Sequence, residues 1–175
     1  MKRYSLLVCA LLLVFSAVRC GYTTSSSLGG YRTIFIEPFK NKIVFTRQNV
    51  RDIYFPLMEV KIRDAVVNRI MFDGHLRMNH EDSSDLIMKG ELVGYDRVAL
   101  RYTDNNDPLE YRVQIMVNLQ LIDQKANQPV WDEPGFVGEA TYFVSGPLTK
   151  TEQAAVEEAT RDLAKRVIER LVENW

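Results

Sequence analysis

The most constraining feature of this chain is a strict alternation of apolar and polar side chains between residues 111 and 121. Every second residue is apolar or aromatic: Tyr111, Val113, Ile115, Val117, Leu119 and Leu121. The residues between them are Arg112, Gln114, Met116, Asn118 and Gln120, and all of these except Met116 are polar. Because successive side chains of a strand point to opposite faces, this pattern predicts a strand with one buried face and one face in water. A sheet of that kind must be covered on a single side.

Other extended segments flank this strand. Residues 86–102 predict a long strand, joined to it by a hairpin loop over residues 103–108. Gly90 and Gly94 in the long strand suggest a bend or bulge, and we place both on the face of Leu86. After a turn at 124–129 we expect a short strand segment at Val130-Trp131 and a last strand at 136–143. Residues 31–38 predict the first strand, and residues 75–79 a short one.

Two segments have helical periodicity. Met58, Ile62, Val66 and Ile70 recur every four residues, which predicts a helix from Pro56 to about residue 72, with Gly74 just past its end. Thr149 and Glu152 have the spacing of a capping box and predict the start of a C-terminal helix. The apolar stripe of this second helix consists of Val156, Leu163, Val167, Ile168, Leu171 and Trp175.

These elements predict an α+β fold, a two-layer sandwich. A mostly antiparallel sheet of about four to five strands would be covered on one face by two α-helices. The other face of the sheet would be the more polar one and would carry Arg112, Gln114, Asn118 and Gln120.

The first 20 residues predict export. Lys2 and Arg3 precede an apolar run that is too short to span a bilayer, and Cys20 follows it almost at once. A cysteine directly after such a signal is where bacteria attach lipid, although Arg19 departs from the small residue that the lipobox has there. An ordinary secretory signal and an uncleaved anchor are the alternatives. We divide the chain into a signal peptide (1–19), a lipidated N-terminus with a flexible Ser/Gly linker (20–30) and a single sandwich domain (31–175).

Composition narrows the possible functions. The leader holds three basic residues and no acidic one, so the chain beyond it is mildly acidic, which argues against general nucleic-acid binding. Cys9 would leave with the signal, so Cys20 has no partner for an internal disulfide, and acylation is the simplest explanation for it.

Catalytic motifs are nearly absent. His75 and His80 are five residues apart, on opposite faces of a strand, which does not favour a shared metal. The Asp104–Asp107 turn lacks the glycine and the distal glutamate of a calcium loop. We therefore expect no enzyme, no metal and no cofactor other than a covalent lipid on Cys20.

Binding is then the function to look for. Arg97, Arg101 and Arg112 flank the long hairpin and are candidates to meet the phosphates or carboxylates of an amphiphilic ligand. Solvated surface charges are the alternative interpretation of these three arginines.

Several segments together resemble the lipopolysaccharide (LPS)-assembly lipoprotein family, LptE. They are Cys20-Gly21-Tyr22, the Ser/Gly linker, the strand Thr33-Ile-Phe-Ile-Glu-Pro-Phe39, the strand from Tyr111 to Asp123, Pro129-Val-Trp-Asp132 and the C-terminal helix.

The resemblance implies a two-layer sandwich that is lipid-anchored in the outer membrane of a Gram-negative bacterium and faces the periplasm. It implies the LPS-assembly β-barrel LptD as partner, with this protein as its plug and assembly helper, and contact with LPS, for which Arg97, Arg101 and Arg112 are the candidates. A periplasm-facing lipoprotein adaptor of another envelope complex is the alternative.

Overall fold

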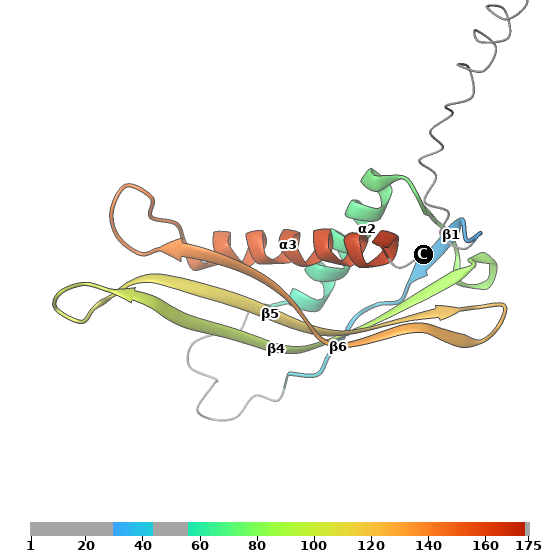
Figure 1. Ribbon diagram of the computed structural model, residues 1–175, viewed down its shortest axis with the longest axis horizontal. Helices are drawn as coiled ribbons and strands as arrows, with labels where there is room; N and C mark the ends of the chain where they lie inside the picture. The colour runs from blue at the N-terminus through green and yellow to red at the C-terminus, as the bar shows by residue number, and fades with distance from the viewer. Residues whose placement is uncertain (1–29, 44–55, 174–175) are drawn as a thin grey trace, which may run out of the picture.

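The computed structural model describes residues 30–43 and 56–173. Two helices lie across one side of a long, twisted sheet (Figure 1). The elements follow in the order β1 (Thr33–Ile36), β2 (Lys40–Asn41), α2 (Met58–Asp73), β3 (Arg77–Met78), the short 3₁₀ helix η2 (Glu81–Ser83), β4 (Leu86–Tyr102), β5 (Pro108–Asp123), β6 (Gln128–Phe143) and α3 (Glu152–Glu173). The predicted α+β sandwich is confirmed. The predicted leader, Cys20 and Trp175 lie outside the described residues.

The sheet is mixed, with a large antiparallel part. Its strand order is β3-β1-β4-β5-β6, and β2 pairs with β4 beside this path. The meander β4-β5-β6 is antiparallel, whereas β1 pairs in parallel with β3 and β4. The six strands are one more than we expected, because the two residues of β2 pair with Glu91 and Leu92 after Pro38 ends the path of β1.

The core lies between the sheet and the two helices. Along β5, Val113, Ile115, Val117, Leu119 and Leu121 are at most 1% exposed, so the predicted alternation is confirmed. From α2, the predicted Met58, Ile62, Val66 and Ile70 are buried against it. The helix α3 lies so close to β6 that a Cβ on Gly138 would come within 2.5 Å of the Ala159 carbonyl oxygen. Glycine at this position therefore sets the distance between helix and sheet.

A bulge in β4 changes which residues face the helices. The register with β5 shifts between Leu92 and Gly94, so one extra residue stands in β4. Before the shift Leu86, Met88 and Leu92 are fully buried, and after it Tyr95 pairs with the buried Ile115. The expected bulge is confirmed, but Gly94 is not on the face of Leu86. It lies on the opposite face, where a Cβ would collide with Met116.

The last strand is longer than we predicted. The segments at 130–131 and 136–143 belong to one continuous strand, β6, and Pro134 and Gly135 form an irregularity within it. The side chain of Asn118 compensates for the interruption, because its Oδ1 accepts a hydrogen bond from the Gly135 N–H at 2.9 Å. Gly135 has a φ of 67°, a conformation that costs glycine little.

The helix ends differ in detail from the prediction. The helix α2 begins at Met58 rather than Pro56, and Gly74 ends it as predicted, with its N–H bonded to the Ile70 oxygen. The capping box is wrong. Thr151, not Thr149, accepts a hydrogen bond from the Ala154 N–H, and Glu152 turns toward the sheet. Within the described ranges, no helix has both the length and the apolar character needed to cross a bilayer.

Candidate functional site

The two ends of the sheet differ, and the candidate arginines lie toward one of them. We call the end with the β4–β5 turn (residues 103–107) and the β6–α3 loop (residues 144–151) the distal end. The proximal end holds the start of β1, β3 and the β5–β6 turn. Asp85 ties the start of β1 to this turn, and the Arg77 N–H bonds β3 to the Arg32 oxygen. Arg97, Arg101 and Arg112 all lie on the distal half of β4 and β5, but the structure does not bring them into one cluster.

Arg97 lies on the helix-covered face, where it forms an ion pair with a carboxylate of α3. Its Nη1 is 2.6 Å from Glu152 Oε2, and Tyr95 donates to Glu152 Oε1 at 2.8 Å. The guanidinium also lies 5.1 Å from the ring centroid of Tyr111, which stacks on Tyr142. Burial, followed by the hydrogen bond to Glu152, raises the pKa of Tyr95. Arg97 therefore holds the first turn of α3 against the sheet, and its role toward a ligand stays a prediction.

Arg101 and Arg112 lie on the opposite, open face of the sheet. Arg101 pairs with Glu110 at 2.9 Å, and its guanidinium is 6.0 Å from the ring centroid of Phe143. Its side chain is nevertheless 67% exposed. Arg112 is 4.0 Å from Glu139 and is more enclosed, at 38%. Of the three arginines, Arg101 offers the most accessible cation.

Exposed apolar side chains gather at the distal end. We call these residues the distal apolar patch: Val98, Leu100, Tyr102, Val144 and Leu148. Leu148 is the most exposed of them, at 69%. A hollow of about 410 Å³ lies beside it, lined by residues of β6 and of the β6–α3 loop. Exposed apolar groups gathered at one end of a domain commonly mark an interaction site.

Lys150 adds a second cation to this end. Its backbone N–H donates to the Phe143 oxygen at 3.0 Å, and the Arg101 guanidinium lies 6.0 Å from the ring centroid of Phe143, so both residues adjoin Phe143. The Lys150 ammonium pairs with Glu158 at 2.7 Å and is 47% exposed. Sequence reasoning missed Lys150 and the distal apolar patch. The available signal was the run Val98-Ala99-Leu100, which breaks the alternation of β4.

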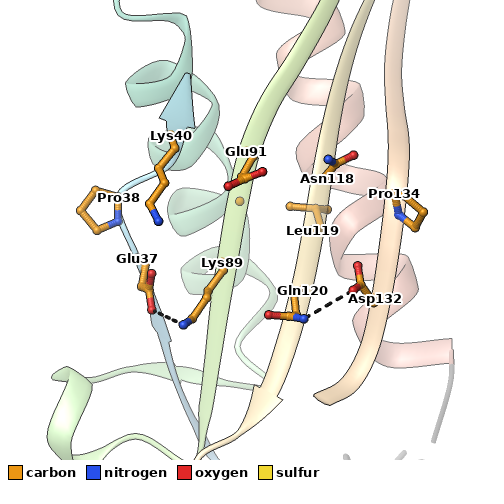
Figure 2. A pocket seen from close by; sticks show the side chains of 11 residues that line it. Glu37, Pro38, Lys40, Lys89, Glu91, Asn118, Leu119, Gln120, Asp132 and Pro134 are labelled. Carbon is orange, nitrogen blue, oxygen red and sulfur yellow. Dashed lines mark hydrogen bonds and ion pairs between the residues drawn. The ribbon is translucent and has the colours of Figure 1, made fainter. Parts of the chain in front are cut away.

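A second concavity opens on the helix-free face, nearer the proximal end (Figure 2). It has a volume of about 420 Å³ and collects side chains from β4, β5, β6 and the segment after β1. Lys89 and Glu37 pair across it at 3.3 Å, and Gln120 reaches Asp132 at 3.4 Å. Its lining residues are Glu37, Pro38, Lys40, Lys89, Gly90, Glu91, Asn118, Leu119, Gln120, Asp132 and Pro134. This cleft makes the open face polar, as the alternation in β5 predicted.

The two histidines lie apart from both concavities. His75 Nδ1 is 2.6 Å from Asp73 Oδ2 just after α2, and His80 precedes η2. In the part of the chain that the structure describes, no three His, Cys, Asp or Glu side chains gather as metal ligands would.

Several solved structures resemble this chain over about four fifths of its length. A hypothetical protein, CT253 from Chlamydia trachomatis, superposes with a TM-score of 0.56 at 9% identity, covering 81% of this chain and 95% of that one. A minor lipoprotein from Acinetobacter baumannii has a TM-score of 0.49 at 12% identity, over 83% and 95%. The rare lipoprotein B from Shewanella oneidensis has 0.46 at 12%, over 79% and 94%.

The sequence family is more specific than the fold. No curated protein sequence matches this chain. The model of the LptE family, described as lipopolysaccharide-assembly, matches residues 31–171, which is nearly the whole described domain. The chain therefore belongs to the LptE family of LPS-assembly lipoproteins, as the sequence resemblance indicated.

Proposed function

We propose that this protein is an outer-membrane lipoprotein of LPS transport, tethered by acyl chains on Cys20 and facing the periplasm. It acts as plug and assembly partner of the LPS-translocating β-barrel LptD, without catalysis and without a cofactor beyond its lipid. The observation that carries the proposal is the family match over residues 31–171.

The surface of the domain supports a place inside a wide barrel. Large barrels have polar, water-filled interiors, so a plug needs a polar exterior. The open sheet face presents the charged cleft of Figure 2, and the outer side of α3 presents exposed Glu157, Arg161 and Lys165. Both layers of the sandwich can therefore face a polar wall.

The distal end supports direct contact with LPS, an amphiphile with phosphate groups and acyl chains. The guanidinium of Arg101 can bind a phosphate, and Lys150, whose backbone bonds to Phe143, supplies a second cation at this end. The distal apolar patch offers apolar surface beside these cations. Arg112 lies on the same face as Arg101, whereas Arg97 would act by positioning α3.

The partner is tested by copurification from detergent-solubilised membranes at native expression. We expect a large β-barrel protein to be recovered in stoichiometric amount. Recovery of a different envelope complex would instead support an adaptor role. A Cys20→Ala variant should leave the membrane fraction, and a variant that stays membrane-bound without lipid would contradict the tether.

LPS contact is tested with charge reversals at the distal end. Arg101→Glu and Lys150→Glu should each weaken LPS binding by the purified protein about tenfold, equivalent to about 1.4 kcal/mol. Arg161→Glu, the same charge change on the exposed side of α3, is the matched control and should bind as the unaltered protein does. Equal binding by all variants would contradict a distal LPS site.

A further inference from the structure

Glu110 is a buried carboxylate that the proposed LPS contact does not use. Among the described residues it is the one acidic residue that is less than a tenth exposed, at 8%. A carboxylate that is taken out of water needs a compensating cation. Arg101 is that cation, because its Nε lies 2.9 Å from Glu110 Oε2. The most accessible arginine of the candidate site is therefore already paired with a buried anion.

Three neighbouring strands hold this pair in place. Glu110 on β5 stands opposite Arg101 on β4 and opposite Phe143 on β6. Side chains that stand opposite each other share one face of the sheet. The Arg101 guanidinium lies 6.0 Å from the ring centroid of Phe143, so the arginine reaches across β5 toward β6. Arg101 and Phe143 therefore cover the carboxylate, which explains its burial on the open face of the sheet.

A second bulge in β4 creates the pairing. The register with β5 shifts between Ala99 and Arg101, so Leu100 is an extra residue in the strand. Ala99 pairs with Tyr111, and in a regular antiparallel ladder Leu100 would therefore stand opposite Glu110. Bulges change the direction of a side chain and are frequent next to functional sites. This bulge brings Arg101 opposite Glu110 in place of a leucine.

We propose that Glu110 is an internal competitor for Arg101, which holds the guanidinium while the site is empty and lowers the affinity of the site for a phosphate of LPS. This inference rests on the distal LPS contact of the proposed function. A phosphate that binds Arg101 comes close to the Glu110 carboxylate, and like charges at short range repel each other. A protein that passes its ligand on must also release it, and a competing anion inside the site favours release.

The substitution Glu110→Gln tests this role, because the amide keeps the shape of the side chain and removes its charge. We expect the purified full chain to bind LPS about fivefold more tightly, with most of the change in the dissociation rate. Glu157→Gln, the same charge change on the exposed side of α3, is the matched control and should bind LPS as the unaltered protein does. LPS whose phosphates have been removed enzymatically should bind the Glu110 variant and the unaltered protein equally, because Glu110 competes only with phosphate.

A double substitution tests whether Glu110 acts through Arg101. In an Arg101→Gln background, Glu110→Gln should leave the Kd for LPS unchanged, because the cation for which carboxylate and phosphate compete is gone. Tightening of similar size in both backgrounds would overturn the proposal, since Glu110 would then repel LPS as any nearby carboxylate does.

A measurement on the unaltered protein does not depend on the folding of any variant. The ¹⁵N resonance of Arg101 Nε should shift when LPS is added, because the guanidinium exchanges a carboxylate for a phosphate. LPS without phosphates should leave this resonance in place. A resonance that does not shift in protein saturated with intact LPS would overturn the exchange of partners.

The remaining outcomes separate this inference from the proposed function. Unchanged or weaker LPS binding by folded Glu110→Gln protein would overturn the competitor role and leave the distal LPS contact intact. An unaltered protein that binds no LPS would contradict the LPS contact of the proposed function, and this inference with it.

Discussion

The proximal and distal halves of the sheet are held against the helices by different kinds of side chain. In the proximal half, aliphatic side chains of β1, β4 and β5, such as Ile34, Leu86 and Leu121, are fully buried under the helices. In the distal half, where α3 begins, polar and aromatic side chains around Glu152 hold the helix against the sheet. The side chains of the distal apolar patch face water instead of the core.

Because of this difference, one half of the sheet mainly stabilises the fold and the other half presents side chains that a partner can contact. Buried aliphatic surface stabilises a domain without offering anything to a partner, whereas the distal half leaves cations and apolar groups open for contact. A substitution in one half should therefore affect folding, and a substitution in the other should affect binding. Each experiment below tests that separation.

The largest effect is expected from truncating the proximal core. Leu121→Ala removes a fully buried side chain and should lower the free energy of unfolding by about 3 kcal/mol, measured by urea denaturation. Leu100→Ala, a truncation of the same size at a 41% exposed distal site, should change it by less than about 0.5 kcal/mol. Comparable losses of unfolding free energy at both positions would contradict the difference between the proximal and distal halves.

A smaller loss is expected where α3 meets β6. The Cβ introduced by Gly138→Ala would overlap the Ala159 carbonyl and the Leu163 side chain, so the helix must shift. We expect a loss of about 2 kcal/mol in the same denaturation experiment, typical of overpacking. Gly146→Ala, in the β6–α3 loop, is not a neutral control because its φ of 88° strains any other residue. Ser145→Ala in the same loop is the better control and should be nearly neutral.

The Glu152 carboxylate should stabilise the distal half by less. Glu152→Ala leaves the half-buried Arg97 and Tyr95 without their shared acceptor, and we expect a loss of about 1–2 kcal/mol. Glu158→Ala, which breaks the more exposed pair with Lys150, should cost less than about 1 kcal/mol. Equal effects of the two substitutions would mean that Glu152 is only another surface charge.

The smallest effect concerns pH and the proximal end. A hydrogen bond from Lys125, followed by that from the Arg32 N–H, holds the pKa of Asp85 far below its usual value of 3.8. A lowered pKa in the folded state stabilises the protein above pH 4, and this contribution is lost as the pH falls below 4. Asp85→Asn should therefore flatten the decline in thermal stability between about pH 4 and pH 2. An unchanged decline in this variant would assign the acid sensitivity to other carboxylates.

The proximal half of the sheet could be predicted from the sequence better than the distal half. Period-2 alternation in β5 and four-residue spacing in α2 record burial directly, so the sandwich and its core could be predicted. The sheet face on which Gly94 lies could not be predicted, because one extra residue in β4 does not visibly change the local pattern of apolar and polar residues. The partners of Glu152 lie up to 57 residues away along the chain, and its spacing from Thr149 suggested a local cap instead. Tertiary hydrogen bonds of this kind override local signals.

The bulge in β4 has a consequence for how relatives of this protein are compared. Val93, the extra residue between Leu92 and Gly94, changes which residues of the strand face the helices from that point on. A relative without it would need a one-residue gap there, or its inward positions would be aligned with outward ones along the whole distal half. Substitution patterns at Arg97 and Val98 would then exchange, and a conserved pairing residue would be read as a variable surface residue.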